Sequence, residues 1–373
     1  MIETSYFYNK LVEKGIGFFS GTPDSLLKDF CAYITDHADR QTHIIAVNEG
    51  AAVALACGYH LATTHIPLVY MQNSGLGNAV NPLLSLADNE VYRIPMVLVI
   101  GWRGEPGVHD EPQHVKQGKV TCRLLESMGI PFAVLEKTED EVNSQIEFCF
   151  KTIAETGSPY ALVIRKDTFA PYALQKKEEH DAVMTREEAI EEIACCRSGV
   201  IVSTTGMISR ELYELRERAG AGHERDFLTV GSMGHASSIA LSIALQSPKL
   251  QVTCLDGDGA VLMHMGALAA IGALKPRNYC HIVLNNAAHD SVGGQPTIAP
   301  FIDIPSAALA CGYTKVYQAK TKEELKKILA EKNEGPTFIE VKVKKGSRKD
   351  LGRPKTTPTE NKEAFMKFVL EQR

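Results

Sequence analysis

Two strand-end motifs in the second half of the chain combine side chains that bind a metal and a phosphate. Asp258 lies between Gly257 and Gly259 after one apolar run, and the next apolar run ends in Asn285 and Asn286. Glycines let a backbone turn tightly against a ligand, and the N-terminus of a following helix offers N–H groups to a phosphate. Carboxylate, amide, carbonyl and phosphate oxygens together satisfy an octahedral magnesium ion. The pattern therefore predicts Mg²⁺ and a diphosphate. The alternative, a simple Asp-Gly turn, is disfavoured by the second strand ending in asparagine.

Glu49 is the matching candidate for proton transfer in the first half. It follows the apolar run 44–47 and opens an alanine-rich helical segment. A carboxyl group at the end of a buried strand can exchange a proton with a bound ligand. Taken alone, Glu49 is better explained as a helix N-terminal glutamate that the helix dipole stabilises. Its interpretation therefore depends on the other motifs of the chain.

The elements that must position these residues alternate between short apolar runs and amphipathic stretches. Runs rich in Val, Ile and Leu, each followed by a glycine-containing turn and a helical segment, are typical of parallel sheets buried on both faces. We therefore predict an α/β protein with two doubly wound parallel-sheet domains. The domains span 1–174 and 189–373, and the polar stretch 175–188 is either a linker or a solvated helix. Helices are expected, among other places, at 24–34, 50–61 and 81–86.

Composition excludes several classes of protein. The 373 residues are 44% hydrophobic and 23% charged, which is ordinary for a globular protein, and the net charge of −5 gives no reason to expect nucleic acid or a membrane as partner. The nine cysteines are scattered without a Cys-x-x-Cys pair, which favours a reducing compartment over disulfides or a cysteine zinc site. No apolar stretch reaches the length of a membrane span, and the first residues do not read as a signal peptide. We expect a cytoplasmic enzyme.

The ordered set of motifs resembles thiamine diphosphate-dependent decarboxylases over essentially the whole chain. The Gly-Asp-Gly turn, followed by a helix and a strand ending in Asn-Asn, is similar to the family signature, and the glycine turn after Asn73 also matches. The resemblance implies pyrimidine-binding and diphosphate-binding domains without a middle domain. It also implies that Glu49 is the carboxylic acid against the cofactor's pyrimidine ring.

The resemblance assigns further residues to the cofactor and the metal. Asp258, Asn286 and the carbonyl of Ala288 would bind Mg²⁺, with Asn285 as the alternative to Asn286. Met233 would be the bulky hydrophobic residue under the cofactor, where the alternative is core packing. The remaining cofactor contacts implied by the resemblance are Gly206, Met207, Gly231, Gly257, Gly259 and Ala260.

Substrate contacts are expected in two places. The polar loop 104–114 follows the fourth strand, and His114 or His109 in it could transfer protons near neutral pH, unless both are ordinary surface histidines. Segment 342–355 carries seven Lys and Arg side chains against one Asp, so it is either an anion site or a solvated basic face. The candidate catalytic and substrate residues besides Glu49 are Asp24, Ser25, Gln113, His114, Arg353 and Lys355.

Short members of this family without a middle domain act on phosphonopyruvate and sulfopyruvate. The resemblance implies Mg²⁺-dependent decarboxylation of 3-phosphonopyruvate to phosphonoacetaldehyde and CO₂, in phosphonate biosynthesis. It also implies a homodimer or higher oligomer with the cofactor at the subunit interface. Two alternatives stay open: a sulfopyruvate decarboxylase, and a non-catalytic subunit that binds thiamine diphosphate. Intact Glu49, Asp258 and Asn286 argue against the second.

Overall fold

The computed structural model describes residues 1–176, 181–332 and 334–372. The chain divides into two compact units: Met1–Glu178 together with Val292–Gln295, and Glu179–Ser291 together with Pro296–Arg373. The predicted linker 175–188 lies partly outside the described residues, and its last residues begin a helix at Arg186. No helix in the described part of the chain is long and apolar enough to cross a membrane.

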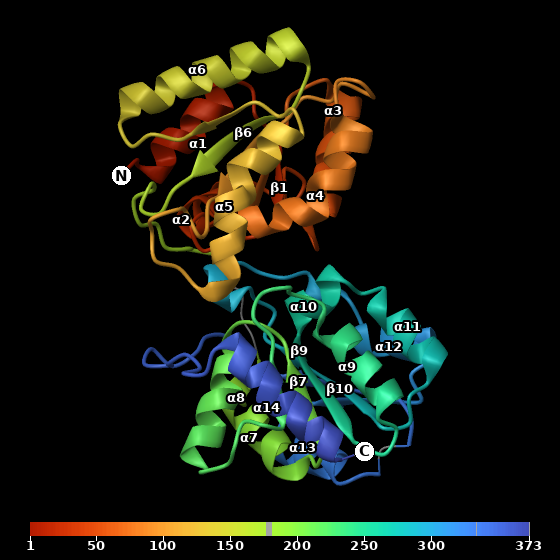
Figure 1. The fold of residues 1–373 in the computed structure, drawn as a ribbon. Helices are drawn as coiled ribbons and strands as arrows, with labels where there is room; N and C mark the ends of the chain where they lie inside the picture. Colours follow the sequence, from red (N-terminus) through yellow and green to blue (C-terminus); the bar gives the residue numbers. More distant parts are fainter. Residues whose placement is uncertain (177–180, 333, 373) are drawn as a thin grey trace. The chain divides into compact units, whose positions relative to one another are not determined.

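Within the described residues, the first unit holds a six-stranded parallel sheet with strand order β2-β1-β3-β4-β6-β5. Helices cover both of its faces, as Figure 1 shows. The elements are α1 (Thr4–Glu13), β1 (Phe19–Gly21), α2 (Lys28–His37), β2 (His43–Ile45), α3 (Glu49–Thr63), β3 (Leu68–Gln72), η1 (Asn73–Gly75), α4 (Leu76–Pro82), η2 (Leu83–Ala87), β4 (Val97–Gly101), α5 (Pro112–Ser127), β5 (Phe132–Val134), α6 (Glu139–Thr156) and β6 (Tyr160–Ile164).

The second unit has a six-stranded parallel sheet of order β11-β12-β10-β9-β7-β8 in the described part of the chain. Its helices are α7 (Arg186–Cys196), α8 (Met207–Arg218), α9 (Ala236–Gln246), α10 (Asp258–Met263), α11 (Ala267–Leu274), α12 (Ile304–Cys311), α13 (Lys322–Leu329) and α14 (Pro358–Glu371), with short turns η3 (Asp290–Val292) and η4 (Ala299–Phe301). Its strands are β7 (Val200–Ser203), β8 (Asp226–Leu228), β9 (Val252–Gly257), β10 (Tyr279–Asn285), β11 (Lys315–Ala319) and β12 (Thr337–Lys342).

Both sheets have the same topology. If each unit's strands are numbered from one in chain order, both orders become 2-1-3-4-6-5. The predicted α/β class and the two parallel sheets are therefore confirmed. Because all strands are parallel, the loops that follow them gather at one edge of each sheet, where ligands bind in such folds.

Alternating side chains of each strand build two apolar layers. In β4, Val97 and Val99 pack with α1, α2 and α6, whereas Leu98 and Ile100 pack with α3, α4 and α5. This burial on both faces explains why the strands are nearly continuous apolar runs. In the second unit, α7, α8 and α13 pack on one face through residues such as Ile190, Leu212 and Leu325.

Two predicted helices were wrong at their ends. The helix expected at 24–34 begins only at Lys28, because the Asp24 carboxylate accepts the backbone N–H of Leu26 and holds a turn there. The helix expected at 81–86 is present but begins earlier, because α4 starts at Leu76 and the π-helix η2 continues it from Leu83 to Ala87. The first difference matters for function, since it places Asp24 and Ser25 in the loop at the sheet edge.

Candidate active site

Glu49 begins α3 directly after β2 and is buried at the sheet edge of the first unit. Its Oε1 accepts a hydrogen bond from Thr22 Oγ1 at 2.9 Å, and its Oε2 accepts one from Asn78 Nδ2 at 2.8 Å. A Cβ added at Gly75 would lie 2.5 Å from Glu49 Oε1, so only glycine leaves room for this carboxylate. The side chain is therefore held in one position by the loop after β1 and by the η1–α4 segment after β3. A helix-dipole role alone would not require such an arrangement.

A second polar cluster of the first unit surrounds Ser25. Arg103, which follows β4, donates to Ser25 Oγ at 2.7 Å and forms a two-bond fork with the Asp110 carboxylate. Burial opposes ionisation of Asp110, but the Arg103 fork and the backbone N–H groups of Glu111 and Gly104 lower its pKa far below the usual range. Sequence reasoning missed Arg103. Its only signal was a position two residues beyond a strand end.

Asp24 lies beside this cluster and is fully buried. Its carboxylate accepts from Gln72 Nε2 at 2.5 Å and from the backbone N–H of Leu26 at 2.9 Å. Burial raises the pKa of Asp24, although both hydrogen bonds and the charge of Arg103 oppose that rise. Asp24 can therefore hold a proton at higher pH than an exposed aspartate.

Gln113 and His114, the two candidates that follow β4 along the chain, are the second and third residues of α5. The His114 side chain is buried, and its Nδ1 has no hydrogen-bond partner among the described residues; the same is true of Gln113 Oε1. Burial, followed by the charge of Arg103, lowers the pKa of His114 to about 4. The expectation of titration near neutral pH is therefore wrong for His114, which is a neutral imidazole at pH 7. His109 is exposed in the loop.

Asp258, in the second unit, begins α10 and is almost fully buried. It accepts a hydrogen bond from Thr297 Oγ1 at 2.6 Å and further bonds from backbone N–H groups, including that of Asn286. Burial still raises the pKa of Asp258 to about 6. A bound cation would stabilise this buried carboxylate, so the position fits a metal ligand.

The two asparagines after β10 have different partners. Asn285 Nδ2 donates to Glu340 Oε1 at 2.6 Å, and its Oδ1 accepts from the backbone N–H of Ala287. Asn286 Nδ2 donates to Asp290 Oδ2 at 2.6 Å. The Oδ1 of each asparagine accepts one backbone N–H and keeps a second lone pair, so the two side chains are alike in this respect. Asn286 is favoured as a metal ligand because its backbone N–H bonds to Asp258, which brings this residue next to the other candidate ligand.

The other predicted cofactor contacts lie around Asp258 in the same unit. Gly206 has a φ of 96° and precedes α8, which begins at Met207. Met233 is half-buried, and a Cβ added at Gly259 would lie 3.3 Å from its Cε. The backbone N–H of Gly231 donates to Thr205 Oγ1 at 3.0 Å. Gly257 and Ala260 flank the Asp258 turn in β9 and α10.

The fit to a diphosphate and a metal rests on two observations about this loop cluster. Thr204 Oγ1 is buried without a partner in the described part of the chain, next to the Gly206 turn. Asp258, Asn286 and the Ala288 carbonyl supply the oxygen donors that Mg²⁺ prefers.

His289 was missed by sequence reasoning. Its Cε1 would lie 3.1 Å from a Cβ at Gly259, and burial lowers its pKa to about 4.

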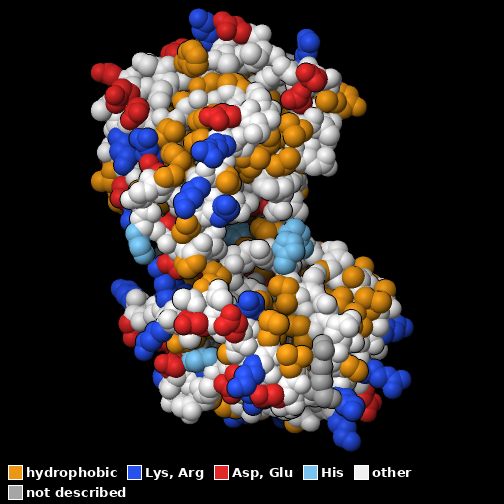
Figure 2. Space-filling model, in the orientation of Figure 1, with side chains coloured by type: hydrophobic (Ala, Val, Ile, Leu, Met, Phe, Trp, Pro, Cys, Tyr) orange, Lys and Arg blue, Asp and Glu red, His pale blue; other side chains and the backbone are white. Residues whose placement is uncertain are grey.

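Three of the seven cations of the basic segment 342–355 lie against acidic side chains. Arg348 forms ion pairs with Glu187 and Glu214, and Lys342 Nζ lies 2.8 Å from Glu340 Oε1. Arg353 is exposed, and Lys355 Nζ lies 3.8 Å from Glu217. Both belong to the second unit, whereas Ser25 and His114 belong to the first. On the face shown in Figure 2, basic and acidic side chains are interspersed rather than separated.

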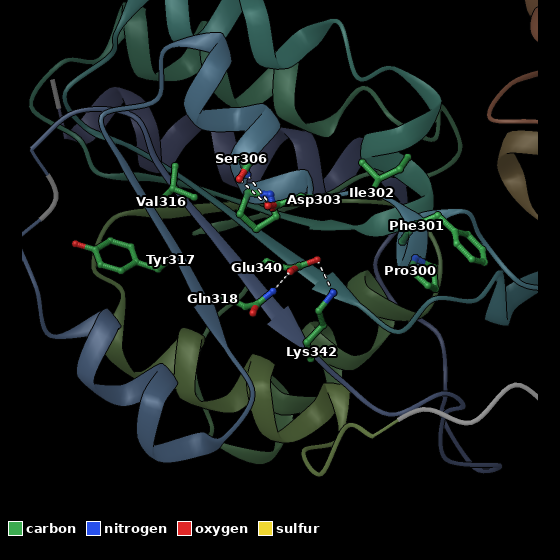
Figure 3. Close-up of a pocket in the computed structure, with 12 residues that line it drawn as sticks. Pro300, Phe301, Ile302, Asp303, Ser306, Val316, Tyr317, Gln318, Glu340 and Lys342 are labelled. Carbon is green, nitrogen blue, oxygen red and sulfur yellow. Dashed lines mark hydrogen bonds and ion pairs between the residues drawn. The ribbon is translucent and has the colours of Figure 1, made fainter.

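A pocket of about 610 Å³ lies beside β11 and β12 of the second unit, away from Asp258. Figure 3 shows Gln318 and Lys342 pointing toward the buried carboxylate of Glu340. Since Glu340 also binds Asn285, this pocket adjoins the support of the asparagine turn rather than the turn itself. Among the predicted site residues and segments, only Lys342, the first residue of segment 342–355, lines it.

A buried group of potential metal ligands lies elsewhere in this unit and includes Cys254, Asp256 and His281. His281 Nδ1 already pairs with the Tyr313 hydroxyl at 3.1 Å, and Asp256 accepts the backbone N–H of Gly257. These bonds satisfy the group within the protein, so we interpret it as part of the core.

Comparison with known proteins identifies the family of the chain. Residues 4–122 match the model of the thiamine pyrophosphate enzyme N-terminal TPP binding domain, and residues 204–341 match that of the C-terminal TPP binding domain. Thiamine pyrophosphate is another name for thiamine diphosphate.

Three relatives match most of the chain. A phosphonopyruvate decarboxylase of Streptomyces viridochromogenes is 36% identical, over 95% of this chain and 92% of its own length. That of Streptomyces hygroscopicus is 35% identical, over 100% of this chain and 95% of its own. A sulfopyruvate decarboxylase of Methanosarcina acetivorans is 28% identical, over 83% of both chains. The chain therefore belongs to the decarboxylases of the thiamine pyrophosphate enzyme family.

Proposed function

We propose that this protein catalyses the thiamine diphosphate- and Mg²⁺-dependent decarboxylation of 3-phosphonopyruvate to phosphonoacetaldehyde and CO₂. The observation that carries the substrate is the match to two phosphonopyruvate decarboxylases along nearly the whole chain. The buried carboxylates of Glu49 and Asp258, one in each unit, support a complete catalytic site. They argue against a non-catalytic subunit.

The cofactor supplies the chemistry of bond cleavage, since its thiazolium ring accepts the electron pair when CO₂ leaves the substrate. The protein's residues would bind and orient. Asp258, Asn286 and the Ala288 carbonyl would hold the metal, and the loops at Gly206 and Gly231 would contact the cofactor. Glu49 would exchange a proton with the pyrimidine ring.

Substrate binding is proposed for the cluster at Ser25. Ser25 and Asp24 would contact the 2-oxo acid, and the neutral His114 would supply hydrogen bonds together with Gln113. Arg353 and Lys355 stay candidates for the phosphonate, because both are exposed cations. Arg348 of the same segment is a weaker candidate, since its charge already pairs with acidic side chains.

A decarboxylation assay tests the proposal. Purified chain with thiamine diphosphate and Mg²⁺ should release CO₂ from phosphonopyruvate faster than from pyruvate or sulfopyruvate at equal concentration. Omission of the metal should abolish that release. No CO₂ from any 2-oxo acid in the loaded protein would contradict the proposed activity.

Sulfopyruvate is the second candidate substrate, and the match to the Methanosarcina acetivorans enzyme favours it. The two substrates differ in charge, because a phosphonate reaches two negative charges and a sulfonate carries one. A higher kcat/KM for sulfopyruvate in the same assay would decide for this alternative.

We also propose a homodimer or larger assembly with Glu49 and Asp258 of different subunits at one cofactor. Inactive Glu49→Gln and inactive Asp258→Ala chains, mixed and reassembled, should regain activity, because a mixed dimer has one site without either lesion. Mixtures that stay inactive although heterodimers form would place the site within one chain.

The nine cysteines are all free thiols, which supports a reducing compartment, and we propose a cytoplasmic role in phosphonate biosynthesis.

A further inference from the structure

Arg103 is the cation most firmly positioned in the Ser25 cluster. Its backbone N–H donates to Asn73 Oδ1 at 3.1 Å, and its carbonyl accepts from Asn73 Nδ2 at 2.8 Å. Asn73 is itself buried and donates to Thr121 Oγ1. The loop after β4 is therefore clamped to the loop after β3 at Arg103, so the guanidinium starts from a fixed backbone.

The guanidinium is oriented by two neighbours and keeps donors for a ligand. Its Nε and Nη2 donate to Asp110 at 2.8 and 2.5 Å, and its Nη1 donates to Ser25 Oγ at 2.7 Å. Arginine has five N–H donors, so one on each terminal nitrogen has no partner among the described residues. Those two donors can bind two oxygens of one tetrahedral anion.

The bond from Arg103 also determines what Ser25 can do. A serine hydroxyl has one hydrogen to donate, and here its oxygen already accepts from the guanidinium. The hydroxyl hydrogen must therefore point away from Arg103, toward an acceptor. An oxygen of a bound anion at the sheet edge is such an acceptor.

Charge around the guanidinium favours directional hydrogen bonds over simple attraction. Asp110 balances the charge of Arg103, and burial keeps the neighbouring His114 neutral near pH 7. The His114 side chain is more than nine-tenths buried with its Nδ1 unpaired within the described part of the chain, which indicates a polar ligand nearby. A site of this kind selects by geometry, as a planar fork does and a lysine ammonium does not.

We infer that Arg103 and the Ser25 hydroxyl bind the tetrahedral anionic group of the substrate, at the end remote from its carboxylate. This inference rests on the proposed function, which supplies the phosphonate or sulfonate. It assigns substrate selection to the first unit and leaves segment 342–355 a secondary role.

The test compares Arg103→Lys with a matched control, Arg165→Lys. Arg165 directly follows β6, the neighbour of β4, and pairs with Glu105 at 3.1 Å. Activity is measured on phosphonopyruvate and pyruvate, together with the Ki of methylphosphonate, which carries the anionic group without the 2-oxo acid. Arg103→Lys should lower the ratio of the two kcat/KM values about 10- to 100-fold, mainly through KM, and raise Ki similarly. Arg165→Lys should leave both quantities unchanged.

A double variant excludes damage to folding as the cause. Arg103→Gln with Asp110→Asn removes both charges, so no uncompensated carboxylate is left buried, and it should show the same loss of selectivity. Unchanged ratio and Ki in both Arg103 variants would overturn the inference, as would a larger change in Arg353→Ala. Wild-type enzyme that turns over no anionic 2-oxo acid would remove the proposed function as well. If the wild-type enzyme prefers sulfopyruvate, the ratio of kcat/KM values is taken between sulfopyruvate and pyruvate, and the inference about Arg103 is tested in the same way.

Discussion

The turn after the fourth strand of each unit shows how one topology serves two kinds of chemistry. In the first unit, this turn follows β4 and supplies Arg103, a hydrogen-bond donor with a protein carboxylate as partner. In the second unit, the equivalent turn follows β10 and supplies Asn286, whose backbone N–H donates to the buried carboxylate of Asp258 and whose Nδ2 donates to Asp290. The two sheets have the same strand order, so the difference between the units lies in the loops.

The turns after the third strands differ in the same way. After β3, Gly75 leaves space for a carboxylate that comes from elsewhere, namely Glu49. After β9, the glycines flank a carboxylate of their own turn, Asp258. In the first unit, the position of the Glu49 carboxylate thus depends on residues of other segments. In the second unit, the oxygen ligands belong to the turns themselves. We therefore expect proton transfer to depend on the first unit and cofactor retention on the second.

Glu49→Gln should have the largest effect on turnover. Loss of a positioned acid–base group lowers kcat by about 10²–10⁴-fold. Thiamine diphosphate affinity, measured by calorimetry, should change little, because the diphosphate is assigned to the second unit. Glu139→Gln is the matched control, since Glu139 also begins a helix of the first unit but lies on its exposed surface. Equal kcat in both variants would leave Glu49 only a helix-dipole role.

Asp258→Asn tests the role expected of the second unit, which is to retain the cofactor. Removing an outer-shell partner of a metal site already costs about 10–100-fold in affinity, so loss of this carboxylate should cost more than about 100-fold in Mg²⁺-dependent cofactor affinity. Calorimetry with and without Mg²⁺ measures it. Asp303→Asn makes the same chemical change at a helix N-cap, where asparagine caps equally well, and should leave affinity intact. Normal affinity in Asp258→Asn would refute the metal assignment.

The two asparagines sharpen the assignment further. Asn286→Ala should weaken Mg²⁺-dependent cofactor binding by at least about 10–100-fold, the range already seen for an outer-shell partner of a metal. Asn285→Ala should act mainly on stability, by about 1–3 kcal/mol, because it removes one of the three side-chain donors of the buried Glu340 carboxylate, the others being Gln318 and Lys342. Calorimetry and thermal melting separate these effects. The reverse pattern would make Asn285 the ligand.

Gly75→Ala tests whether the first unit's carboxylate depends on a cavity at a neighbouring turn. The added methyl must displace Glu49, which should lower the free energy of unfolding by about 1–3 kcal/mol. It should also raise the activation free energy for kcat by a similar amount. Gly77→Ala, two residues on, meets nothing within 4 Å and should be neutral or slightly stabilising. If both variants keep full activity, Gly75 does not position Glu49.

The smallest effect concerns His43 of β2, which pairs with the Tyr70 hydroxyl at 2.8 Å. Burial lowers the pKa of His43 to about 4, below its unfolded value, so protonation favours the unfolded state. Stability of the first unit should be complete above about pH 6.5 and fall by roughly 1–3 kcal/mol as pH drops toward 4. Denaturant titrations of wild type and His43→Gln between pH 4 and 7.5 measure it. An identical pH slope in both would exclude His43 as the cause.

The sequence by itself determined the fold class and the family, and it supplied the main candidates for the site. Asp258, Asn286 and Glu49 each lie within three residues of the end of an apolar run, and that pattern is local. A residue at the end of a parallel strand reaches the ligand edge whatever its neighbours are, so its role can be read without tertiary contacts. The boundaries of helices near the site were less predictable, because the Asp24 side chain competes for backbone N–H groups.

Only the tertiary structure decided which side chains meet across strands. Arg103 and Ser25 are 78 positions apart, and Asn285 and Glu340 are 55 apart, so no local pattern connects them. Parallel register brings β4 and β1 loops to one edge, and it pairs Glu340 of β12 with Val283 of β10, two residues before Asn285, so that the Glu340 and Asn285 side chains can meet. The charge of segment 342–355 likewise looked available in the sequence, until folding placed Glu187 and Glu214 against Arg348. Hydrogen bonds and ion pairs depend on distance in space, and strand register and helix packing set that distance.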